Sequence, residues 1–420
     1  MPHTHRHFLA TMLLLLGILW PRSGSAASLD ACDEAGRWRG ISGQPPPEVQ
    51  AVEAPSGKAL HFRFAESRQP HFAGRSFVAD ESWDRAAGIS FRFRGNGSDD
   101  FVAVSLVDET FTMRYAALIG LQSKEWRTVR LRWTDFVPEV VTADWFGAPG
   151  TAMQPSKIRG IWFGRWFYFK PWAACTFELD ELALEAEIPQ TEPALPDASG
   201  MQRTLAKLRA KELVTLVALG DSITYGTHIK DRARDGWPGR LQDELRKAFG
   251  YDQIHVVNKG IGGLETRQAI ALLPRDVAAM KPDLVLVHFG YNDYSSLLQK
   301  RKSPEEQRAI ARGNWRELVL RVRRLTEGQS EVLLIATIPG ADEARRESMN
   351  FFGETAREVA AELRCAYTEA PRSAFQAARS NGTLDTLFVQ LEDGKPDVAH
   401  PSESGQMLFS GALIPDFTTR

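Results

Sequence analysis

The sequence predicts a two-domain protein, with an N-terminal β-sandwich followed by a C-terminal α/β domain built on a parallel sheet. From about residue 36 to 187, apolar and polar residues alternate in short runs separated by Gly, Pro and Asp, a pattern typical of antiparallel strands. From residue 201 onward, apolar runs alternate with amphipathic helical stretches, which predicts a parallel sheet. Residues 188–200 are rich in proline and lack periodicity, so they predict a semi-rigid linker.

Length and composition limit the classes of function. A chain of 420 residues is long enough for two domains, each with its own core. Its 43% hydrophobic and 25% charged residues are typical of a globular protein. A net charge of −2 argues against nucleic acid as the main partner, because phosphate binding normally requires an excess of basic residues.

Residues 1–27 have the pattern of a signal peptide. Arg6 supplies the positive charge, Phe8–Trp20 is an apolar run too short to span a bilayer comfortably, and Ser23–Ala27 offers small residues for cleavage. We therefore expect a secreted or periplasmic protein that begins near residue 27 or 28, with no stable membrane insertion after cleavage. An uncleaved anchor is the alternative. Cleavage would also remove the histidines at positions 3, 5 and 7, so they predict no metal site.

Export would bring the three cysteines into an oxidising compartment, where disulfides can form. In an oxidising compartment Cys32 and Cys175 could form a disulfide, which would leave Cys365 as a buried apolar residue. A competing interpretation takes Leu29–Cys32 as a lipobox, with Cys32 as a lipid anchor. Asp30 fits that motif poorly.

The first domain, residues 28–187, is predicted from alternating segments with one apolar face. The clearest are Gly88–Gly95, Phe101–Val107, Trp126–Trp133 and Thr176–Leu184. The order of Ile89–Gly97, Trp126–Val129, Ile158–Phe163 and Phe177–Leu182 resembles jelly-roll carbohydrate-binding modules and galactose-binding-like domains. Aromatic residues are dense in Trp162–Trp172, and Trp145 lies in a Gly/Pro-rich loop. These aromatic rings either pack in the core or stack on sugar rings.

The second domain, residues 201–420, alternates strands and helices. The predicted strands are Leu213–Leu219, Ile254–Val257, Leu284–Phe289 and Glu331–Thr337. The predicted helices are Met201–Lys211, Gly236–Phe249, Glu265–Met280, Pro304–Thr326, Met349–Arg364 and Ser402–Leu413.

Ser222 is the candidate nucleophile. It follows the first strand of the second domain, and open α/β sheets bind ligands at the carboxyl ends of their strands. The Gly-x-Ser-x-Gly motif of α/β-hydrolases is absent, because Thr224 stands two residues after Ser222. A serine hydroxyl also needs a base, an orienting carboxylate and donors for the oxyanion.

Later segments offer these groups. His400 could take the Ser222 proton, and Asp397, three residues earlier on what we expect to be one loop, could orient the imidazole. Asn292 follows a strand and could donate its side-chain amide to the oxyanion. The glycines in Asn258–Gly263 could supply a backbone N–H.

Four ordered blocks resemble the SGNH or GDSL hydrolase family: Gly220–Ser222, Asn258–Gly263, Gly290–Asp293 and Asp397–His400. The resemblance covers roughly the last half of the chain. It implies a three-layer flavodoxin-like fold and an esterase mechanism that uses Ser222, His400 and Asp397. It also implies an oxyanion hole made of the Ser222 N–H, a glycine N–H and Asn292.

Some assignments stay open at this point. Gly263 is the expected glycine donor, with Gly260 and Gly262 as alternatives. Asp221 and Tyr291 are the predicted substrate contacts. Asp293 is expected either to serve in this block or to cap the next helix.

The sequence therefore predicts a secreted serine esterase that removes a small acyl group, acetyl above all, from a polysaccharide or oligosaccharide. No cofactor or metal is implied, because the chemistry needs only a nucleophile, a base and fixed dipoles. An acyltransferase, a lipase or a thioesterase could use the same site. The polar segment Tyr225–Asp235 disfavours the apolar trough of a lipase. An alternative from another class is a carbohydrate-binding protein with a weak or idle hydrolase domain.

Overall fold

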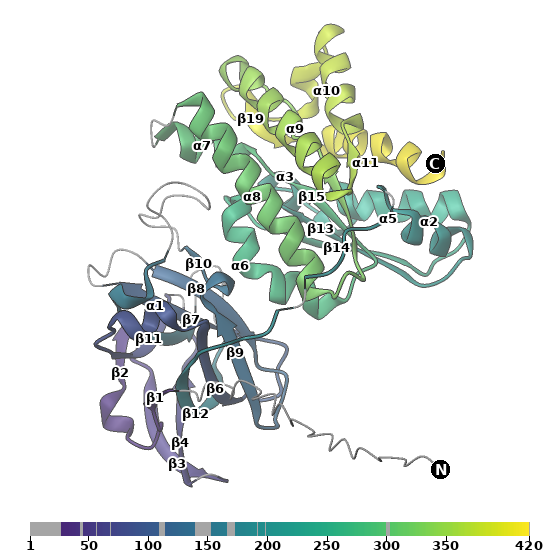
Figure 1. Ribbon diagram of the computed structural model, residues 1–420. Helices are drawn as coiled ribbons and strands as arrows, with labels where there is room; N and C mark the ends of the chain where they lie inside the picture. Colours follow the sequence, from purple (N-terminus) through teal and green to yellow (C-terminus); the bar gives the residue numbers. More distant parts are fainter. Residues whose placement is uncertain are drawn as a thin grey trace, which may run out of the picture.

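The computed structural model describes residues 27–42, 45–55, 57–67, 69–108, 114–138, 153–165, 173–190, 192–197, 199–299 and 303–419. The signal-peptide prediction lies outside these residues, as do the Trp145 loop and residues 166–172 of the aromatic segment. The described chain forms a β region between Ala27 and Glu185 and an α/β region between Gln202 and Thr418 (Figure 1).

The β region contains two antiparallel sheets. The strands of the first sheet lie in the order β3-β4-β12-β6-β9, and β1 pairs with the far end of β12. Their bounds are β1 (Ala27–Asp30), β3 (Glu48–Ala54), β4 (Gly57–Phe64), β6 (Gly88–Arg94), β9 (Arg127–Arg132) and β12 (Cys175–Glu185).

The second sheet has the order β10-β8-β7-β11-β5-β2. Its strands are β2 (Arg39–Ser42), β5 (His71–Ser76), β7 (Phe101–Asp108), β8 (Arg114–Gly120), β10 (Val137–Pro138) and β11 (Ile158–Arg165). A short helix, α1 (Glu81–Arg85), and the 3-10 turns η1 (Ala35–Arg37), η2 (Trp133–Asp135) and η3 (Pro155–Lys157) lie between the strands. The strands predicted at Gly88, Phe101, Trp126 and Thr176 are all present, within two residues of the expected bounds.

The two sheets share one apolar core. Phe62 of β4 and Phe177 of β12 stack at a ring distance of 4.8 Å, and Phe163 of β11 packs against both. Side chains of this core alternate along each strand, because successive residues of a strand point to opposite faces of the sheet. Phe163 thus confirms the core interpretation for one aromatic of the dense segment, whereas Trp162 is only partly buried.

Cys32 and Cys175 do not form a disulfide, which the sequence had left open. Cys32, Cys175 and Cys365 are all free and buried. Cys32 lies close to Leu182, whereas Cys175 begins the same strand and pairs with Phe64. A strand rises about 3.3 Å per residue, so the length of β12 separates the two thiols far beyond disulfide distance. Cys365 is buried as predicted.

The α/β region is built on a parallel sheet, as predicted, with the strand order β14-β13-β15-β16-β17. Numbered along the chain, this order is 2-1-3-4-5, in which the switch point lies between the first and third strands. The strands are β13 (Val214–Gly220), β14 (Ile254–Gly260), β15 (Leu284–His288), β16 (Glu331–Ile335) and β17 (Ala366–Thr368).

Helices cover both faces of this sheet (Figure 1). On one face, Leu216 and Ala218 pack with α2 (Gln202–Arg209), α5 (Trp237–Phe249) and α11 (Glu403–Thr418). On the other face, Val217 and Leu219 pack with α6 (Thr266–Asp276), α8 (Pro304–Leu325) and α9 (Glu343–Leu363). Both faces of the strands are therefore apolar, as expected of a buried parallel sheet. Among the described residues, no helix has the length and apolarity needed to cross a membrane.

Several smaller elements complete this region. They are α3 (Ser222–Tyr225), α4 (Arg232–Asp235), η4 (Ala278–Met280), α7 (Tyr291–Gln299), α10 (Ala370–Ser380) and η5 (Leu384–Leu387), with a two-stranded antiparallel sheet of β18 (Phe388–Gln390) and β19 (Pro396–Pro401). The loop expected to hold Asp397 and His400 is therefore a strand, β19. Strand β17, helix α10 and strand β18 had no prediction, because their short segments carry little periodicity.

The β region and the α/β region share a buried seam. Strand β7 is buried along almost its whole length on both faces, because one face joins the core between the two β sheets and the other contacts the α/β region. Ala103 of β7 and Leu118 of β8 pack in the same apolar cluster as Ile270 of α6. The β region is therefore attached by an apolar surface as well as by the linker.

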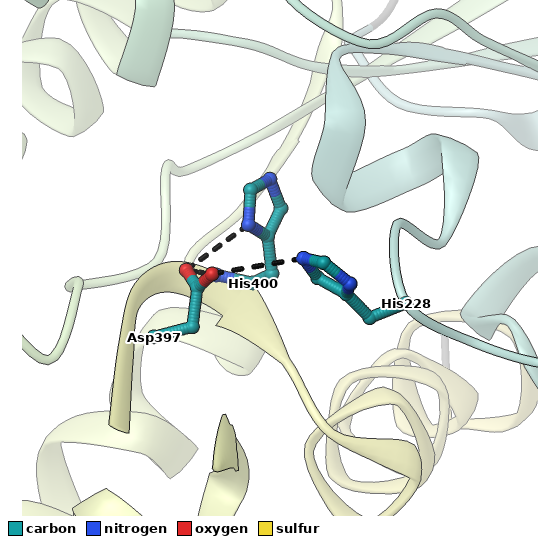
Figure 2. Close-up of side chains that lie close together, drawn as sticks. All are labelled: His228, Asp397 and His400. Atoms are coloured by element: carbon teal, nitrogen blue, oxygen red, sulfur yellow. Dashed lines mark hydrogen bonds and ion pairs between the residues drawn. The ribbon is translucent and has the colours of Figure 1, made fainter. Parts of the chain in front are cut away.

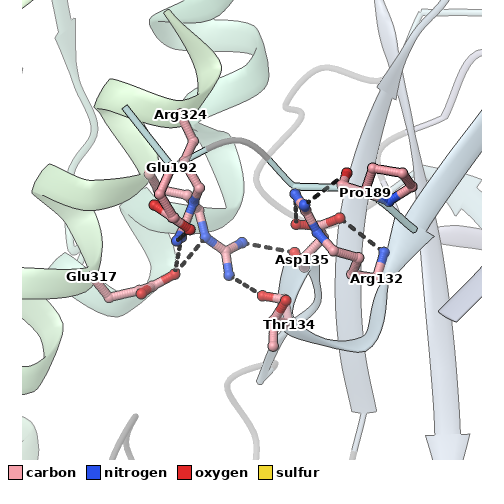
Figure 3. Close-up of polar contacts among 8 residues, drawn as sticks. Arg132, Thr134, Asp135, Pro189, Glu192, Glu317 and Arg324 are labelled. Carbon is pink, nitrogen blue, oxygen red and sulfur yellow. Dashed lines mark hydrogen bonds and ion pairs between the residues drawn. The ribbon is translucent and has the colours of Figure 1, made fainter. Parts of the chain in front are cut away.

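A buried arginine bridges this seam. Arg321 of α8 is 7% exposed and donates to the backbone carbonyls of Thr134 and Asp135 in the β region. Its Nε also donates to Glu317 over 2.9 Å. Figure 3 shows Glu317, Thr134 and Asp135 on the two sides of this contact. Hydrogen bonds from a charged donor to these carbonyl groups join the two regions.

The substitution Arg321→Met should weaken this seam. It keeps the apolar volume but removes the charged donor of the Thr134 and Asp135 carbonyl groups, so unfolding should cost about 1–3 kcal/mol less. Thermal and urea unfolding of the purified full chain would measure the change. Arg316→Met on the same helix is the matched control, because its ion pair with Glu362 is solvent-exposed and should contribute little. Equal effects of both substitutions would contradict a role for Arg321 in the seam.

Candidate active site

Strand β13 and helix α3 position Ser222. The strand ends at Gly220, and Asp221 caps α3 by accepting a hydrogen bond from the Ile223 N–H over 2.9 Å. A Cβ atom at position 220 would lie 2.0 Å from Thr224 Oγ1, so only glycine allows the sharp turn. Ser222 is thereby the first residue of α3, beside the switch point of the sheet.

His400 and Asp397 meet Ser222 in space. His400 Nε2 lies 2.9 Å from Ser222 Oγ, although the two residues are 178 positions apart. His400 Nδ1 lies 3.0 Å from Asp397 Oδ1. Both residues project from β19, and α3 packs beside this strand. A serine, an imidazole and a carboxylate thus form one hydrogen-bonded chain.

The Asp397 carboxylate is held by more than His400. Its Oδ1 accepts hydrogen bonds from the backbone N–H groups of Ala399 at 2.8 Å and of His400 at 2.9 Å. Burial alone would raise the pKa of this carboxyl, but these N–H groups and the His400 ring outweigh burial and hold the pKa below its usual value. Asp397 is therefore negatively charged at neutral pH and favours a proton on His400 Nδ1.

The loop between β14 and α6 carries the candidate oxyanion donors. Gly263 is exposed, and its φ of 76° lies in the left-handed region that favours glycine. Gly262 is also exposed. Gly260 differs, because its N–H already donates to Asn258 Oδ1 over 2.8 Å. The backbone of Tyr225 would meet a Cβ atom at position 260 within 2.2 Å, so this glycine serves close packing.

Asn292 lies in the first turn of α7, directly after β15. One N–H of its amide donates to the Leu264 carbonyl over 3.1 Å. Asn258 on the other side of the loop donates to the Thr224 carbonyl over 2.8 Å. These two bonds hold the glycine loop between α3 and α7. The second N–H of Asn292 is left to donate elsewhere.

Asp293 caps a different helix from the one that we expected. It lies inside α7, and its carboxylate accepts from the N–H of Thr266, the first residue of α6, over 3.1 Å. Burial, and then the nearby charge of Glu265, raise the pKa of Asp293 to about 7. Asp293 thus joins α7 to the start of α6, next to the glycine loop.

Asp221 and Tyr291, the predicted substrate contacts, are both buried, and burial disfavours direct contact with a substrate. Asp221 is fully buried at 0% exposure, and burial raises its pKa to about 7. Tyr291 is 6% exposed and donates its hydroxyl to the Val398 carbonyl over 2.9 Å. Asp221 shapes the turn at Ser222, and Tyr291 fastens α7 to β19.

His288 is excluded as a base. It is fully buried at the end of β15, and burial lowers its pKa to about 3. The Ile338 N–H donates to its Nε2 over 3.4 Å. It is therefore a neutral histidine of the interior.

His228 was not among the site residues predicted from the sequence. This residue follows α3, its side chain is 48% exposed, and its Nε2 lies 3.8 Å from Asp397 Oδ2 (Figure 2). Its ring is 5.4 Å from the ring of His400. Within the described part of the chain, His228, Asp397 and His400 are the side chains close enough to share a metal ion, with ligand atoms within 4.8 Å of one another. The only signal in the sequence was its position six residues after Ser222.

The surface beside Ser222 is polar. Tyr225 is 37% exposed, and the guanidinium of Arg232 lies 4.2 Å above its ring. Lys230 and Arg234 are also exposed. We call this segment, residues 225–234, the rim.

Comparisons with known proteins agree with this geometry. Residues 218–408 match the model of the GDSL-like lipase/acylhydrolase family. An acetylxylan esterase of Geobacillus stearothermophilus is 29% identical over 212 residues, covering 47% of this chain and 91% of that protein. The thioesterase 1/protease 1/lysophospholipase L1 of Escherichia coli (strain K12) is 32% identical over 106 residues, covering 25% of this chain and 48% of that protein.

Among solved structures, the acetylxylan esterase Axe2 of Geobacillus stearothermophilus matches with 24% identity and a TM-score of 0.39, covering 49% of this chain and 94% of that chain. From the family match and the curated relatives, the C-terminal half of this chain belongs to the GDSL/SGNH hydrolase family and is an esterase of that family.

Proposed function

We propose that this chain is a secreted serine esterase that removes small acyl groups, acetyl above all, from a polysaccharide or oligosaccharide. Ser222 Oγ attacks the acyl carbon while His400 Nε2 takes its proton, and Asp397 stabilises the resulting imidazolium. His400 then protonates the departing sugar hydroxyl. Water, activated by His400, attacks the acyl-enzyme and releases the carboxylic acid and free Ser222.

The oxyanion of both tetrahedral intermediates is stabilised by three donors in this proposal. They are the backbone N–H of Ser222, the backbone N–H of Gly263 and the side-chain amide of Asn292. Ser222 contributes as the first residue of α3, where helix N–H groups have no partner within the helix. The left-handed backbone at Gly263 and the free amide N–H of Asn292 support the other two.

The observation that carries the proposal is the chain of hydrogen bonds from Asp397 through His400 to Ser222, at 3.0 and 2.9 Å. Each distance lies within the range required for proton transfer between heavy atoms. The lowered pKa of Asp397 favours the tautomer in which Nε2 is free to accept the serine proton.

The substrate class is supported by three observations of different kinds. Two relatives are acetylxylan esterases, from Geobacillus stearothermophilus and Xylanibacter ruminicola. The rim beside Ser222 is polar and charged. The first β sheet also bears a hollow of about 990 Å³ whose lining includes Arg92, Arg130 and Glu181, and such side chains can hydrogen-bond to sugar hydroxyls.

In this proposal residues 28–187 form a jelly-roll β-sandwich of the carbohydrate-binding kind, residues 188–200 the linker and residues 201–420 the hydrolase domain. Residues 1–27 direct export and are then removed. An acylated glycan outside the cytoplasm is the substrate that such an arrangement would meet.

A second candidate function, hydrolysis of thioesters or lipids, follows from the Escherichia coli relative named as a thioesterase and lysophospholipase. A thioesterase, a lipase or an acyltransferase would use the same three residues. These candidates differ from a carbohydrate esterase in the length of the acyl group and in the acceptor of that group.

The substitution Ser222→Ala should reduce hydrolysis of an aryl acetate by on the order of 10⁴-fold or more, because no other group replaces the nucleophile. Steady-state rates and a thermal unfolding curve would be measured together. Ser380→Ala, at an exposed position on α10, is the control and should keep full activity. Retained turnover by Ser222→Ala in a folded protein would reject the nucleophile, and an inactive wild type would favour a purely sugar-binding protein.

The substitution Asn292→Ala should lower kcat by on the order of a hundred-fold, with little change in KM, because its amide would bind the oxyanion of the transition state and not the ground-state ester. The matched control is Asn381→Ala, which removes an exposed amide at the end of α10 and should keep full activity. A loss of only a few-fold in Asn292→Ala would move the donor to another group.

The specificity constant should fall more than ten-fold from aryl acetate to aryl octanoate, because the charged side chains of the rim, Lys230, Arg232 and Arg234, disfavour a long apolar chain. Acetate release from acetylated xylan, mannan, pectin and peptidoglycan would identify the glycan. A preference for octanoate would favour the thioesterase or lipase alternative. Accumulation of an acylated sugar acceptor instead of free acetate would favour the acyltransferase.

A further inference from the structure

His228 lies beside the proposed catalytic residues but has no part in the acyl transfer described above. Figure 2 shows its ring beside that of His400, with both rings facing the carboxylate of Asp397. Its backbone φ of 67° lies in the left-handed region, which residues other than glycine adopt at a cost unless the surrounding structure imposes it. The fold therefore holds a second imidazole against a carboxylate that already orients the first.

We propose that His228, Asp397 and His400 form a binding site for a divalent transition-metal ion, of which Zn²⁺ fits best, and that metal binding and ester hydrolysis exclude each other. Two imidazoles and one carboxylate are donors that Zn²⁺ accepts readily. Three protein ligands also leave a fourth tetrahedral position for water.

The distances support this donor set. Zn²⁺ binds nitrogen and oxygen at about 2.0–2.2 Å, so its ligand atoms lie about 3.3 Å apart in a tetrahedral site. His400 Nδ1 is 3.0 Å from Asp397 Oδ1, and His228 Nε2 is 3.8 Å from Asp397 Oδ2. One ligand atom from each of the three residues lies within 4.8 Å of the other two, so the donors would need to approach one another by about 1.5 Å at most.

Metal binding would require mainly a movement of the His228 side chain. The His228 side chain is 48% exposed, whereas the side chains of Asp397 and His400 are 12% and 22% exposed. Asp397 is fixed by the N–H groups of Ala399 and His400. Rotation of His228 toward this fixed carboxylate would complete the site without repacking the core.

Metal binding would disable His400 through its tautomer. As a base, the neutral ring carries its proton on Nδ1 and offers the lone pair of Nε2 to Ser222. A metal ion on Nδ1 occupies the lone pair there, so the ring proton moves through water to Nε2. Nε2–H can then only donate to Ser222 Oγ and cannot accept its proton. This inhibitory consequence rests on the proposed function, whereas the binding itself does not.

The test uses Zn²⁺ alone and the chain after removal of residues 1–27, because His3, His5 and His7 could also bind Zn²⁺. Calorimetric titration of the wild type should give one site per chain, and Ser222→Ala, which keeps all three ligands, should bind with the same affinity. His228→Asn removes the ring while keeping a residue that tolerates a left-handed backbone, and it should bind at least ten-fold more weakly. His61→Asn is the matched control, because His61 also pairs with a carboxylate, Glu178 at 3.5 Å, but without a second imidazole.

Activity provides the second measurement. Hydrolysis of an aryl acetate by the wild type should fall as the site saturates with Zn²⁺ and return when a chelator is added. The rate of His228→Asn, relative to its own rate without metal, should be at least ten-fold less sensitive.

Each contrary outcome has a separate meaning. Absence of stoichiometric binding to the wild type, or equal binding by His228→Asn, would overturn the metal site. Binding at His228 without inhibition would overturn the mutual exclusion. A wild type without esterase activity would refute the proposed function, and the calorimetric result would still decide the metal site.

Discussion

The contact between Ser222 Oγ and His400 Nε2 is the interaction around which the α/β region is organised, because its two partners come from opposite ends of that region. Ser222 is fixed by the turn from β13 into α3. His400 is fixed by β19, which Tyr291 fastens to α7. Gln406 connects the two sides, since its amide donates to the Ile223 carbonyl at 3.2 Å and its oxygen accepts from the Trp237 N–H at 2.9 Å. Helix α11, which follows His400, is thereby bonded to α3, which begins with Ser222.

Two buried carboxylates cap the helices beside this contact. Asp221 caps α3 and Asp293 caps α6, and burial raises the pKa of both to about 7. Asp397 differs, because backbone N–H groups and an imidazole converge on it and lower its pKa. Asp397 is therefore charged near neutral pH, whereas burial disfavours the charged form of Asp221 and Asp293, so Asp397 is the aspartate suited to stabilise a positive imidazole.

The seam between the two regions has a consequence for how they act together. Helix α6 begins at Thr266, just after Gly263, and packs against β8 and β10 of the β region. Arg321 adds hydrogen bonds to the same surface. The β region therefore packs against the helix that follows the glycine loop, and an apolar surface would become exposed if it were removed. A flexible tether alone would leave β7 with a solvated outer face, whereas both faces of β7 are buried.

The sequence by itself determined the class of each region and the position of its strongly periodic strands and helices, because periodicity two and periodicity 3.6 are local properties of the chain. It also identified Ser222, Asp397, His400, Asn292 and the glycine loop, since each follows a strand or stands at a short fixed spacing. Only the tertiary structure decided the burial of Asp221 and Tyr291, the separation of Cys32 from Cys175, the cap that Asp293 gives to α6 and the place of His228 beside Asp397. These four depend on which segments meet in space, and a distance between residues far apart in the chain leaves no periodic trace in one sequence.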